Sequence, residues 1–479
     1  MRKLFMLVGT LLLSACAVGP DYRQPADTAP AGYLRADAPL FSSSTPDPEF
    51  WRRFDDPLLT RLVEDALAAN NTLHVALARY ERAQALLRGS KADRLPTVTG
   101  SAEAGYQQLS ADQAPGISRR DREGETYAAG VNVLWELDLF GRVRRSIRAQ
   151  QAEAMAVGAD LAALQVVVVA DLVAGYFELR GLQEQLRVAR ANAAIQADSL
   201  ALVERRLAAG RGTTLDAARA RAQLEATLSR LPILEGEIAA TTHRLSVLTG
   251  REPGALAVEL EAARPLPALP ATVATGLPAE LLRRRPDIVA AERRIAAATA
   301  RVGIATADLY PRFALTGLLG TQAADPGDLF GRNSETRLLA LGVDWTFLQV
   351  GQVRARIAAA EADVDASLAQ YRQTVLRALE ETETAMVRYA RAQREHAHLQ
   401  DAAAAAAEAS RLARRRYELG RADFLQVLDA ERAQLELQDR LAVSQTRSAT
   451  LLVALYKALA GGWPERAGTP HLAGRTESL

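Results

Sequence analysis

The sequence predicts a mainly α-helical chain that also contributes strands to a transmembrane β-barrel. Three observations predict this fold class. Two very long segments carry apolar or small residues every three or four positions, two pairs of shorter segments alternate apolar with polar residues, and the whole arrangement occurs twice within the 479 residues. These periodicities are typical of long packed helices and of strands with one apolar face. Alanine and arginine, both strong helix formers, are abundant, and only three of the 58 basic residues are lysine.

Residues 1–15 predict a lipoprotein signal peptide. Arg2 and Lys3 precede an apolar run from Leu4 to Leu13, which is too short to span a membrane as a helix. The run ends in Leu13-Ser14-Ala15-Cys16, which resembles the bacterial lipobox, and the resemblance implies cleavage before Cys16 and acylation of that residue. Ala17 stands where an aspartate would retain a lipoprotein at the inner membrane. The alternative is a secreted protein whose single cysteine is incidental.

The first half of the chain begins with an extended, lipid-anchored segment at 16–55, which is rich in proline and has no periodicity. A helix is expected from Asp56 until shortly before Pro96, because leucines recur there at helical spacing. Two strands follow at about 97–106 and 126–138, where apolar and polar residues alternate.

A helix far longer than a globular core needs is expected at 142–208. Its apolar residues follow a coiled-coil spacing, and at 1.5 Å per residue it would extend ~100 Å. The segment 210–214, Gly-Arg-Gly-Thr-Thr, ends it in a tight tip, because glycine accepts a left-handed turn. A return helix is expected from about 214 to 249.

The sequence then repeats itself. Trp135 to Ile147 recurs as Trp345 to Ile357, with tryptophan, glycine, valine, arginine and isoleucine in matching places, and Gly210-Arg211 recurs as Gly420-Arg421. Repeat 1 is therefore expected at 56–250, a connector at 251–278, repeat 2 at 279–460 and a C-terminal tail at 461–479. Within repeat 2 the expected elements are a first helix, strands at about 312–320 and 338–347, a long helix at 352–418, a tip at 420–423 and a return helix.

The apolar faces of the four strands are expected to contact lipid. The lipid-facing residues are predicted to be Tyr127, Val131, Val133, Trp135, Leu341, Val343, Trp345 and Phe347. Alternation over about ten residues suits a membrane barrel, although an ordinary half-buried sheet shows it too. The predicted export and the lack of an apolar partner for the sheet favour the barrel. The most apolar helical stretch, Leu164 to Leu179, contains Asp171 and Glu178, which argue against a spanning helix.

Four strands are too few to close a barrel. Outer membrane barrels begin at about eight strands, and eight leave room only for side chains or a narrow lumen. Three copies of the chain would supply twelve strands and an aqueous lumen, together with a ring of twelve long helices. We therefore expect a homotrimer.

Four motifs connect the chain to a known family. They are Cys16-Ala-Val-Gly-Pro-Asp-Tyr22, Phe50-Trp-Arg-Arg-Phe-Asp-Asp-Pro-Leu58, Gly276-Leu-Pro-Ala-Glu-Leu-Leu-Arg-Arg-Arg-Pro-Asp-Ile288, and Arg416-Tyr-Glu-Leu-Gly420 followed by Phe424-Leu-Gln-Val-Leu-Asp-Ala430. With them the mature chain resembles the outer membrane factors, the TolC/OprM-like channel-tunnels of tripartite efflux systems, and especially their lipoprotein branch. The resemblance implies a passive trimeric duct for drugs or other small molecules, with a 12-stranded barrel in the outer membrane and a 12-helix periplasmic tunnel. Its tip would dock on a periplasmic adaptor bound to an inner-membrane pump.

The resemblance also implies a gate at the tip. Asp216 and Tyr417 match gating positions of the family, and Asp429 matches a carboxylate that constricts the lumen. A gating arginine of the family is replaced by Ala422, with Arg421 beside it, and a second ring carboxylate is replaced by Gln426. Gly210, Gly212 and Gly420 are the expected adaptor contacts. Asp216 has a simpler explanation as well, because an anion is favourable in the first turn of any helix.

Other classes of function fit less well. The 58 basic and 57 acidic residues nearly cancel, so no strong field attracts nucleic acid. We expect no cofactor, no metal site and no enzymatic activity, because the nucleotide, esterase and zinc-protease motifs are missing. His396 and His398 lie two residues apart on an expected helix, so their rings diverge and do not share a metal. A structural or adhesive coiled-coil lipoprotein without a pore is the main alternative, and a periplasmic adaptor is another.

Overall fold

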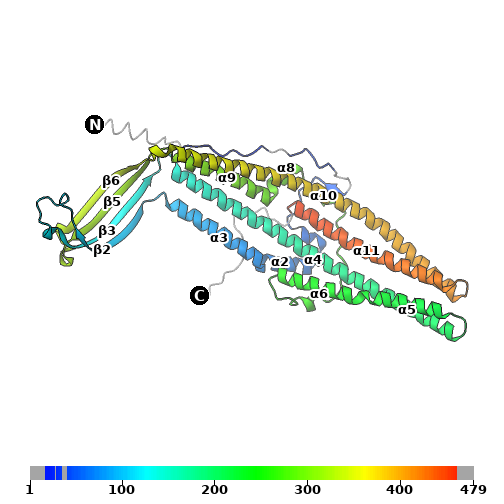
Figure 1. Cartoon of the computed structure of the whole chain (residues 1–479). Helices are drawn as coiled ribbons and strands as arrows, with labels where there is room; N and C mark the ends of the chain where they lie inside the picture. Colours follow the sequence, from blue (N-terminus) through cyan, green and yellow to red (C-terminus); the bar gives the residue numbers. More distant parts are fainter. Residues whose placement is uncertain (1–16, 27–28, 35–39, 461–479) are drawn as a thin grey trace. The chain divides into compact units, whose positions relative to one another are not determined.

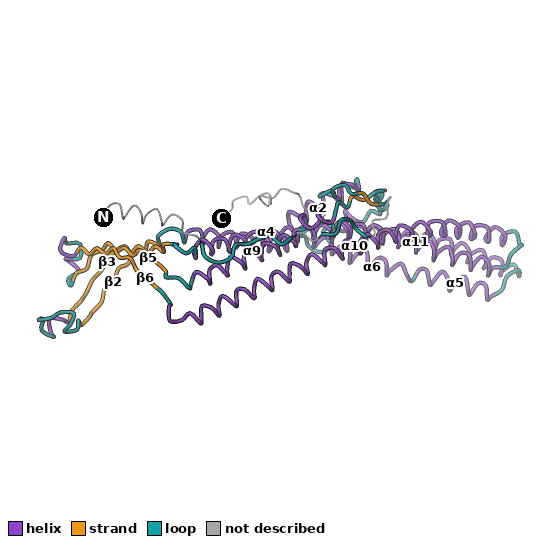
Figure 2. Tube along the Cα trace, turned by 90° about the horizontal axis from the view of Figure 1, so that it is seen from above, coloured by secondary structure: helices purple, strands orange, loops and turns teal. Residues whose placement is uncertain are grey.

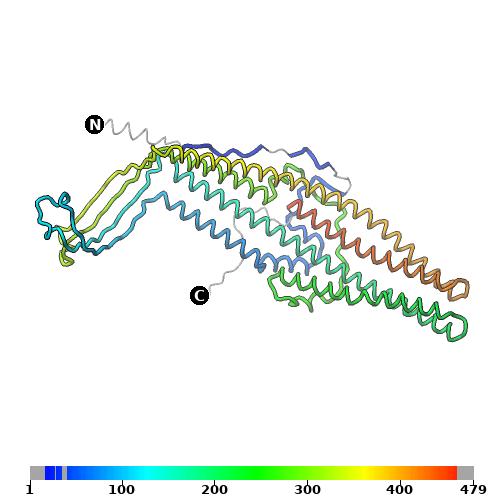
Figure 3. The backbone as a smooth tube through the Cα atoms, in the orientation of Figure 1, coloured from blue at the N-terminus to red at the C-terminus, as the bar shows by residue number. Residues whose placement is uncertain are grey.

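A computed structural model describes residues 17–26, 29–34 and 40–460 of the chain. The signal peptide, Cys16 and the tail at 461–479 lie outside the described residues. The chain divides into two compact units, each made of several segments, and Figure 3 traces the backbone coloured by residue number. The first unit comprises Met1–Ala26, Arg79–Gly158 and Ala290–Arg372, and the second comprises Asp27–Ala78, Ala159–Val289 and Gln373–Leu479.

The first unit contains an antiparallel four-stranded sheet (Figure 1). Its strands are β2 (Thr97–Gln108), β3 (Glu123–Leu137), β5 (Arg312–Ala323) and β6 (Glu335–Asp344), in the order β2-β3-β5-β6. Short connections lead from β3 and β6 into the long helices α4 (Arg142–Ala208) and α10 (Val350–Glu418) (Figure 2). The helices α3 (Asn71–Ala92) and α9 (Pro286–Ala307) precede β2 and β5. Each repeat therefore places a strand pair between two helices.

Matching tryptophans anchor the two strand pairs in the same way. Trp135 donates from its indole Nε1 to the carbonyl oxygen of Arg94 at 3.0 Å, and Trp345 donates to that of Leu309 at 3.1 Å. The two contacts span 41 and 36 residues, so they differ by the five residues that repeat 2 lacks in the loop between its strands. The sequence repeat is thus also a repeat of side-chain contacts.

The last strand lies three residues earlier than predicted. β6 ends at Asp344, opposite Arg312, whereas the alternation suggested a strand at 338–347. Pro311 precedes Arg312 and has no backbone N–H to extend the ladder. Trp345 and Phe347 therefore follow the strand, Phe347 in a 3₁₀ helix at Phe347–Gln349, and their assignment to the strand was wrong.

The second unit combines helices from both repeats around an aromatic core. Its elements include α2 (Pro57–Ala69), α5 (Thr214–Leu228), α6 (Arg230–Leu248), α7 (Ala257–Leu260), α8 (Pro278–Arg284) and α11 (Phe424–Ala458), with a short parallel pairing of β1 (Phe41–Ser42) and β4 (Val273–Ala274). A 3₁₀ helix at Phe50–Phe54 inserts its rings into the core, where Phe50 stacks on Tyr456 at 4.6 Å between ring centres. The return helix of repeat 1, expected to be continuous, is interrupted at Ser229, because Pro232 fits only the first turn of a new helix.

Each repeat uses a side chain at the break in its first helical segment to cap its own return helix. Asn70, between α2 and α3, donates from Nδ2 to the carbonyl oxygen of Leu248 at 2.9 Å. Arg285, between α8 and α9, donates to that of Ala458 at 3.0 Å. Both bonds satisfy a carbonyl group that the end of a helix leaves without a helical partner.

By length and composition alone, helix α4 contains a stretch that is long and apolar enough to cross a membrane. The sequence analysis expected no spanning helix here, because of Asp171 and Glu178. Half of that stretch is buried within the structure. Leu172, Tyr176 and Phe177 of this helix are completely buried. The apolar character of α4 is therefore explained by its place in the core.

Candidate functional site

The two helical hairpins of the second unit end in tips of the same construction, which lie side by side (Figures 1 and 2). Gly210 and Gly420 both have a φ of +69°, the left-handed conformation that glycine adopts without strain. Their N–H groups donate to the carbonyl oxygens of Leu207 and Tyr417, both at 2.9 Å, and the following arginines donate one residue further back. This is the Schellman pattern at the end of a helix. A Cβ atom on Gly212 would lie 3.0 Å from the backbone of Leu207, so this residue too has little space for a side chain.

Asp216 lies in the first turn of α5 and takes part in its cap. Thr213 accepts a hydrogen bond from the Asp216 N–H at 3.1 Å and donates its hydroxyl to Asp216 Oδ2 at 2.7 Å. Asp423 is the N-cap residue of α11, as Thr213 is of α5, and its carboxylate accepts a hydrogen bond from the N–H of Gln426 at 3.1 Å. The carboxylate of Asp216 thus stabilises its own helix start within one protomer.

Tyr417 is buried between the two hairpins, with 6% of its surface exposed. It packs in an apolar cluster whose other buried members are Val203, Ala220, Phe424 and Val427. The guanidinium of Arg206, from the last turn of α4, lies over the Tyr417 ring at 4.1 Å from its centre. Its Nη2 donates to the carbonyl oxygens of Tyr417 and Glu418 at 2.8 and 3.2 Å, at the end of α10 where a cation is favourable.

The other predicted gate residues are not joined to Tyr417. Arg421 and Asp429 are exposed, and within the described part of the chain no ion pair engages either side chain. The cation over Tyr417 is Arg206, which the sequence analysis did not identify. Its position four residues before Gly210, matched by Arg416 before Gly420, was the available signal.

A buried ion pair near the tip was missed as well. Arg414 of α10 pairs with Glu431 of α11 at 2.7 Å, and Ser199 of α4 joins them. The matching positions of repeat 1 hold Glu204 and Arg221, an opposite-charge pair with the same spacing of 17 residues, and this correspondence was visible in the sequence.

The strand register places six of the eight residues predicted to face lipid on one face of the sheet. Trp135 lies beside Leu315, which lies beside Leu341, and the next row of that face joins Val98, Val133, Gly317 and Leu339. Tyr127, Val131 and Val343 share this face by the two-residue period of a strand. Leu341 and Val343 are 60% and 59% exposed, so the face is apolar and open. Trp345 and Phe347 lie just beyond the strand, with ring centres 5.6 Å apart.

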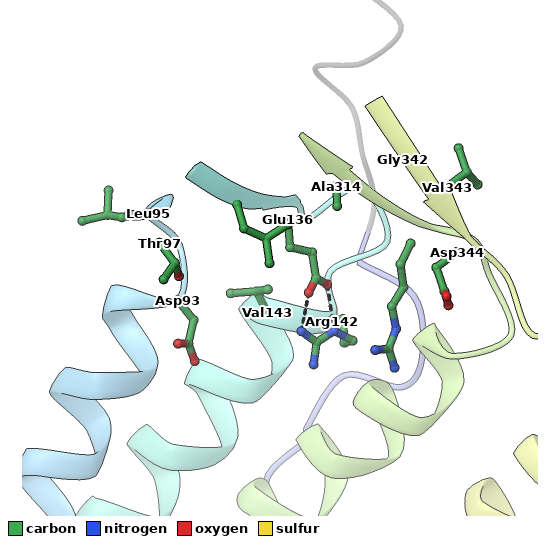
Figure 4. A pocket seen from close by; sticks show the side chains of 12 residues that line it. Asp93, Leu95, Thr97, Glu136, Arg142, Val143, Ala314, Gly342, Val343 and Asp344 are labelled. Carbon is green, nitrogen blue, oxygen red and sulfur yellow. Dashed lines mark hydrogen bonds and ion pairs between the residues drawn. The ribbon is translucent and has the colours of Figure 1, made fainter. Parts of the chain in front are cut away.

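The opposite face of the sheet is more polar, although it includes Leu134 and Leu338, and it is hollowed where the strands meet the helices. A depression of about 530 Å³ is lined by Glu136 and Asp344 from the strands and by Asp93 and Arg142 from the helical side. Figure 4 shows Glu136 and Arg142 facing each other, joined by two hydrogen bonds of 2.7 and 2.5 Å. Such a charged lining suits water and solutes. Among the described residues, no group of three His, Cys, Asp or Glu side chains could hold a metal ion.

The start of the described chain is fixed to the first unit by Arg145, whose side chain is only 3% exposed. Its guanidinium donates to the carbonyl oxygens of Val18 and Gly19 at 3.2 and 3.0 Å and to the carboxylate of Asp21 at 2.9 Å. Ala17 packs closely on Gly141. A Cβ atom added to Gly141 would lie only 2.5 Å from the Cβ atom of Ala17. The residue that follows Cys16 is therefore held at the start of α4.

A sequence profile of one family matches most of the chain. The family is described as outer membrane efflux protein, and the matched residues are 62–251 and 277–461, one segment in each repeat. Among characterised relatives, outer membrane protein OprJ of Pseudomonas aeruginosa is 32% identical over 481 residues, which cover 98% of both chains. The solvent efflux pump outer membrane protein SrpC of Pseudomonas putida is 31% identical and covers 96% of this chain and 98% of its own.

Solved structures resemble the whole described fold. The outer-membrane channel OprN superimposes with a TM-score of 0.88 at 42% identity, covering 94% of this chain and all of its own. The open state of the MtrE outer membrane channel of Neisseria gonorrhoeae gives a TM-score of 0.82 at 26% identity, covering 94% and 99%.

Proposed function

Because this chain belongs to the outer membrane efflux protein family, we propose that three copies of it form one passive duct, closed at the helical tips and opened by a periplasmic adaptor. The protein is an outer membrane channel component of an efflux system, with a periplasmic tunnel. The trimer, the gate and the partners are the proposed parts, and so is the absence of any catalytic role.

The observation that carries the trimer is the pair of open sheet edges. β2 and β6 each have only one neighbour among the described strands. Because the order β2-β3-β5-β6 is antiparallel throughout, the two outer strands run in opposite directions. A copy of the sheet can therefore add its β2 to β6 with antiparallel pairing, and three copies would close a barrel of about twelve strands.

The two faces of the sheet fit the two sides of such a barrel. The face with Val133, Leu339 and Leu341 would contact lipid, and the face with Glu136 and Asp344 would line a wet lumen. From Tyr127 to Trp135 the strand extends about 26 Å along its own axis, and at a tilt of about 40° it would cross about 20 Å of the ~25 Å apolar band of an outer membrane barrel.

The gate is proposed at the two tips. Tyr417 and Arg206 hold the hairpins of one protomer together, while the exposed Arg421 and Asp429 are free to meet a neighbouring protomer. Asp216, engaged in its own helix cap, contributes mainly by fixing the shape of the tip. An adaptor that binds the turns at Gly210, Gly212 and Gly420 would shift this closed arrangement toward an open one.

The partners, more than this chain, are proposed to determine which cargo is exported. Relatives are named for efflux of solvent or toluene and for export of pyoverdine, and toluene and pyoverdine are chemically unlike each other. We propose that an inner-membrane pump selects and drives the cargo, drugs or other small molecules, through a duct of low selectivity.

Cys16 is proposed as the lipid anchor, because Arg145 fixes the following residues at the first unit. Replacement by Cys16→Ser should abolish incorporation of labelled palmitate, and a variant that retains the label would refute the assignment.

The assembly is tested by extracting the full-length protein from outer membranes in mild detergent and measuring its mass. A trimer that resists denaturing detergent until heated supports the duct. A monomer that becomes soluble once the anchor is removed would instead support a pore-free coiled-coil lipoprotein.

A further inference from the structure

The return helices of the two repeats, α6 and α11, end in the same turn. Gly250 and Ala460 lie 210 positions apart, and both have a positive φ, of 72° and 57°. Their N–H groups donate to carbonyl oxygens three residues earlier, at 3.0 and 3.1 Å. Alanine adopts this left-handed conformation only at a cost, and Ala460 is buried, so the packing around it holds the turn in place. The chain therefore leaves both return helices through a left-handed residue.

In repeat 1 the connector beyond this turn is fixed to both helices of its hairpin. Leu256 donates its N–H to Ser246 Oγ of α6 at 3.3 Å. Gln183 of α4 donates from Nε2 to the carbonyl oxygen of Leu260 at 2.7 Å. The side chains of Leu256 and Leu260 are completely or almost completely buried. The start of the connector thus docks through two polar contacts and two apolar side chains.

Repeat 2 has polar groups at the same two positions. Gln393 of α10 and Tyr456 of α11 correspond to Gln183 and Ser246, again 210 positions later. The Nε2 atom of Gln393 and the hydroxyl oxygen of Tyr456 are buried, and neither makes a hydrogen bond of normal geometry to a described residue. A buried polar group without a partner costs about 1–3 kcal/mol, and folded proteins rarely leave one. Both groups therefore require a partner that the described residues do not supply.

The C-terminal tail at 461–479 is long enough to supply it. The carbonyl oxygen of Ala458 lies 3.5 Å from the hydroxyl of Thr382, so the tail begins beside this part of α10. Gln393 lies eleven residues further along the helix, about 17 Å away. The connector reaches Gln183 ten residues after Gly250, and the tail has nineteen residues.

We propose that the C-terminal tail docks on α10 and α11 as the connector docks on α4 and α6, with Gln393 and Tyr456 as its polar contacts. With the spacing of repeat 1, the tail residues nearest Gln393 are those around Pro470. Trp463 and Leu472 supply apolar side chains for such a site to bury. The tail then stabilises the second unit, and the inference does not depend on the proposed duct.

Photo-crosslinking of the full-length protein in outer membranes tests the docking. Benzoylphenylalanine is introduced in place of His471, and the linked peptides are identified by mass spectrometry. The proposal predicts links to α10 near Gln393, or to the facing part of α11, within a single chain that migrates as a monomer after denaturation. Links to α4 or α6, to a second chain or to another protein would overturn it, and so would links without a preferred position.

The same probe in repeat 1 is the control for the crosslinking. Val258 of the connector lines a groove with Arg187 of α4 and His243 of α6. Benzoylphenylalanine in place of Val258 should therefore link to these two helices, which shows that the method reports the docking of such a segment.

A second experiment tests the contact at Gln393. Gln393→Ala should lower the midpoint of thermal unfolding of the full-length protein by about 1–3 °C, because it removes one buried hydrogen bond. In a chain shortened to end at Ala460 the same substitution should change the midpoint by less than about 1 °C, because the partner is gone. Gln183→Ala, whose partner is the connector, should lower the midpoint in both chains. Equal effects of Gln393→Ala with and without the tail would overturn the contact, and the crosslinking decides if the shortened chain does not assemble.

Discussion

The guanidinium of Arg206 lies over the ring of Tyr417, 4.1 Å from its centre, and donates to the carbonyl oxygen of the same residue at 2.8 Å. One side chain thus holds the end of α4 against the end of α10 through both the ring and the backbone of Tyr417. Each hairpin tip is stable by its own caps, so this contact mainly sets where the two tips lie relative to each other.

Replacing Arg206 should loosen the closed tip. We expect Arg206→Gln to raise the open-to-closed ratio in single-channel recordings by about five- to thirtyfold, since a cation–π contact and a charged hydrogen bond together contribute ~1–2 kcal/mol. The neighbouring Arg205→Gln is the matched control, because Arg205 is exposed. Equal behaviour of the two variants would remove Arg206 from the gate.

Adjacent residues of β6 distinguish the two faces of the barrel. Leu341→Arg places a charge on the apolar face and should lower the stability of the folded barrel by about 2–4 kcal/mol in a bilayer, whereas Ala340→Arg, on the polar face, should cost far less. Urea unfolding in liposomes, followed by tryptophan fluorescence, measures both. If Ala340→Arg were the more harmful change, the faces would have to be exchanged.

The cap at Asn70 should be important for the second unit. Asn70 accepts from the N–H groups of Thr72 and Leu73 and donates to Leu248, so Asn70→Ala removes bonds at two helix ends. We expect a loss of about 1–2 kcal/mol in the free energy of unfolding. Asn71→Ala, one residue away and exposed, should have little effect when both are compared by thermal unfolding with circular dichroism.

Tyr176 makes the fold sensitive to alkaline pH. Its burial, and then its hydrogen bond to Asp56, raises the pKa of Tyr176 to about 12. Because this lies above the unfolded value of about 10, the stabilisation is complete below pH 10 and is lost as the pH rises through 12. Between pH 10 and 12 the wild type should lose on the order of 1–2 kcal/mol more stability than Tyr176→Phe. The exposed Tyr106→Phe should follow the wild type, and a Tyr176→Phe curve that did so too would contradict the account.

Local patterns in the sequence were enough to predict much of the architecture. Alternation located the strands, and the recurrence of Trp135 as Trp345 located the second set. The end of β6 could not be predicted from its own residues, because it depends on Pro311 before the partner strand. The interruption at Ser229 was overlooked although Pro232 signalled it.

The candidate site was less predictable than the fold. Tyr417 was identified through the family resemblance, but its partner Arg206 lies 211 residues away in the sequence, and Ser199 lies 232 residues from Glu431. Periodicity shows which face of a helix is buried, but it does not show which distant helix covers that face. Only the matching of charged pairs between the repeats could have indicated Arg414 and Glu431.

The central claim is that three chains form one duct closed at the tips. Its most direct test is the current through the purified trimer in a planar bilayer, compared with that of the double variant Asp216→Ala with Tyr417→Phe. The account predicts discrete openings of low conductance for the wild type and larger or longer openings for the variant. Trimers that insert into the bilayer but carry no current in either form would contradict it.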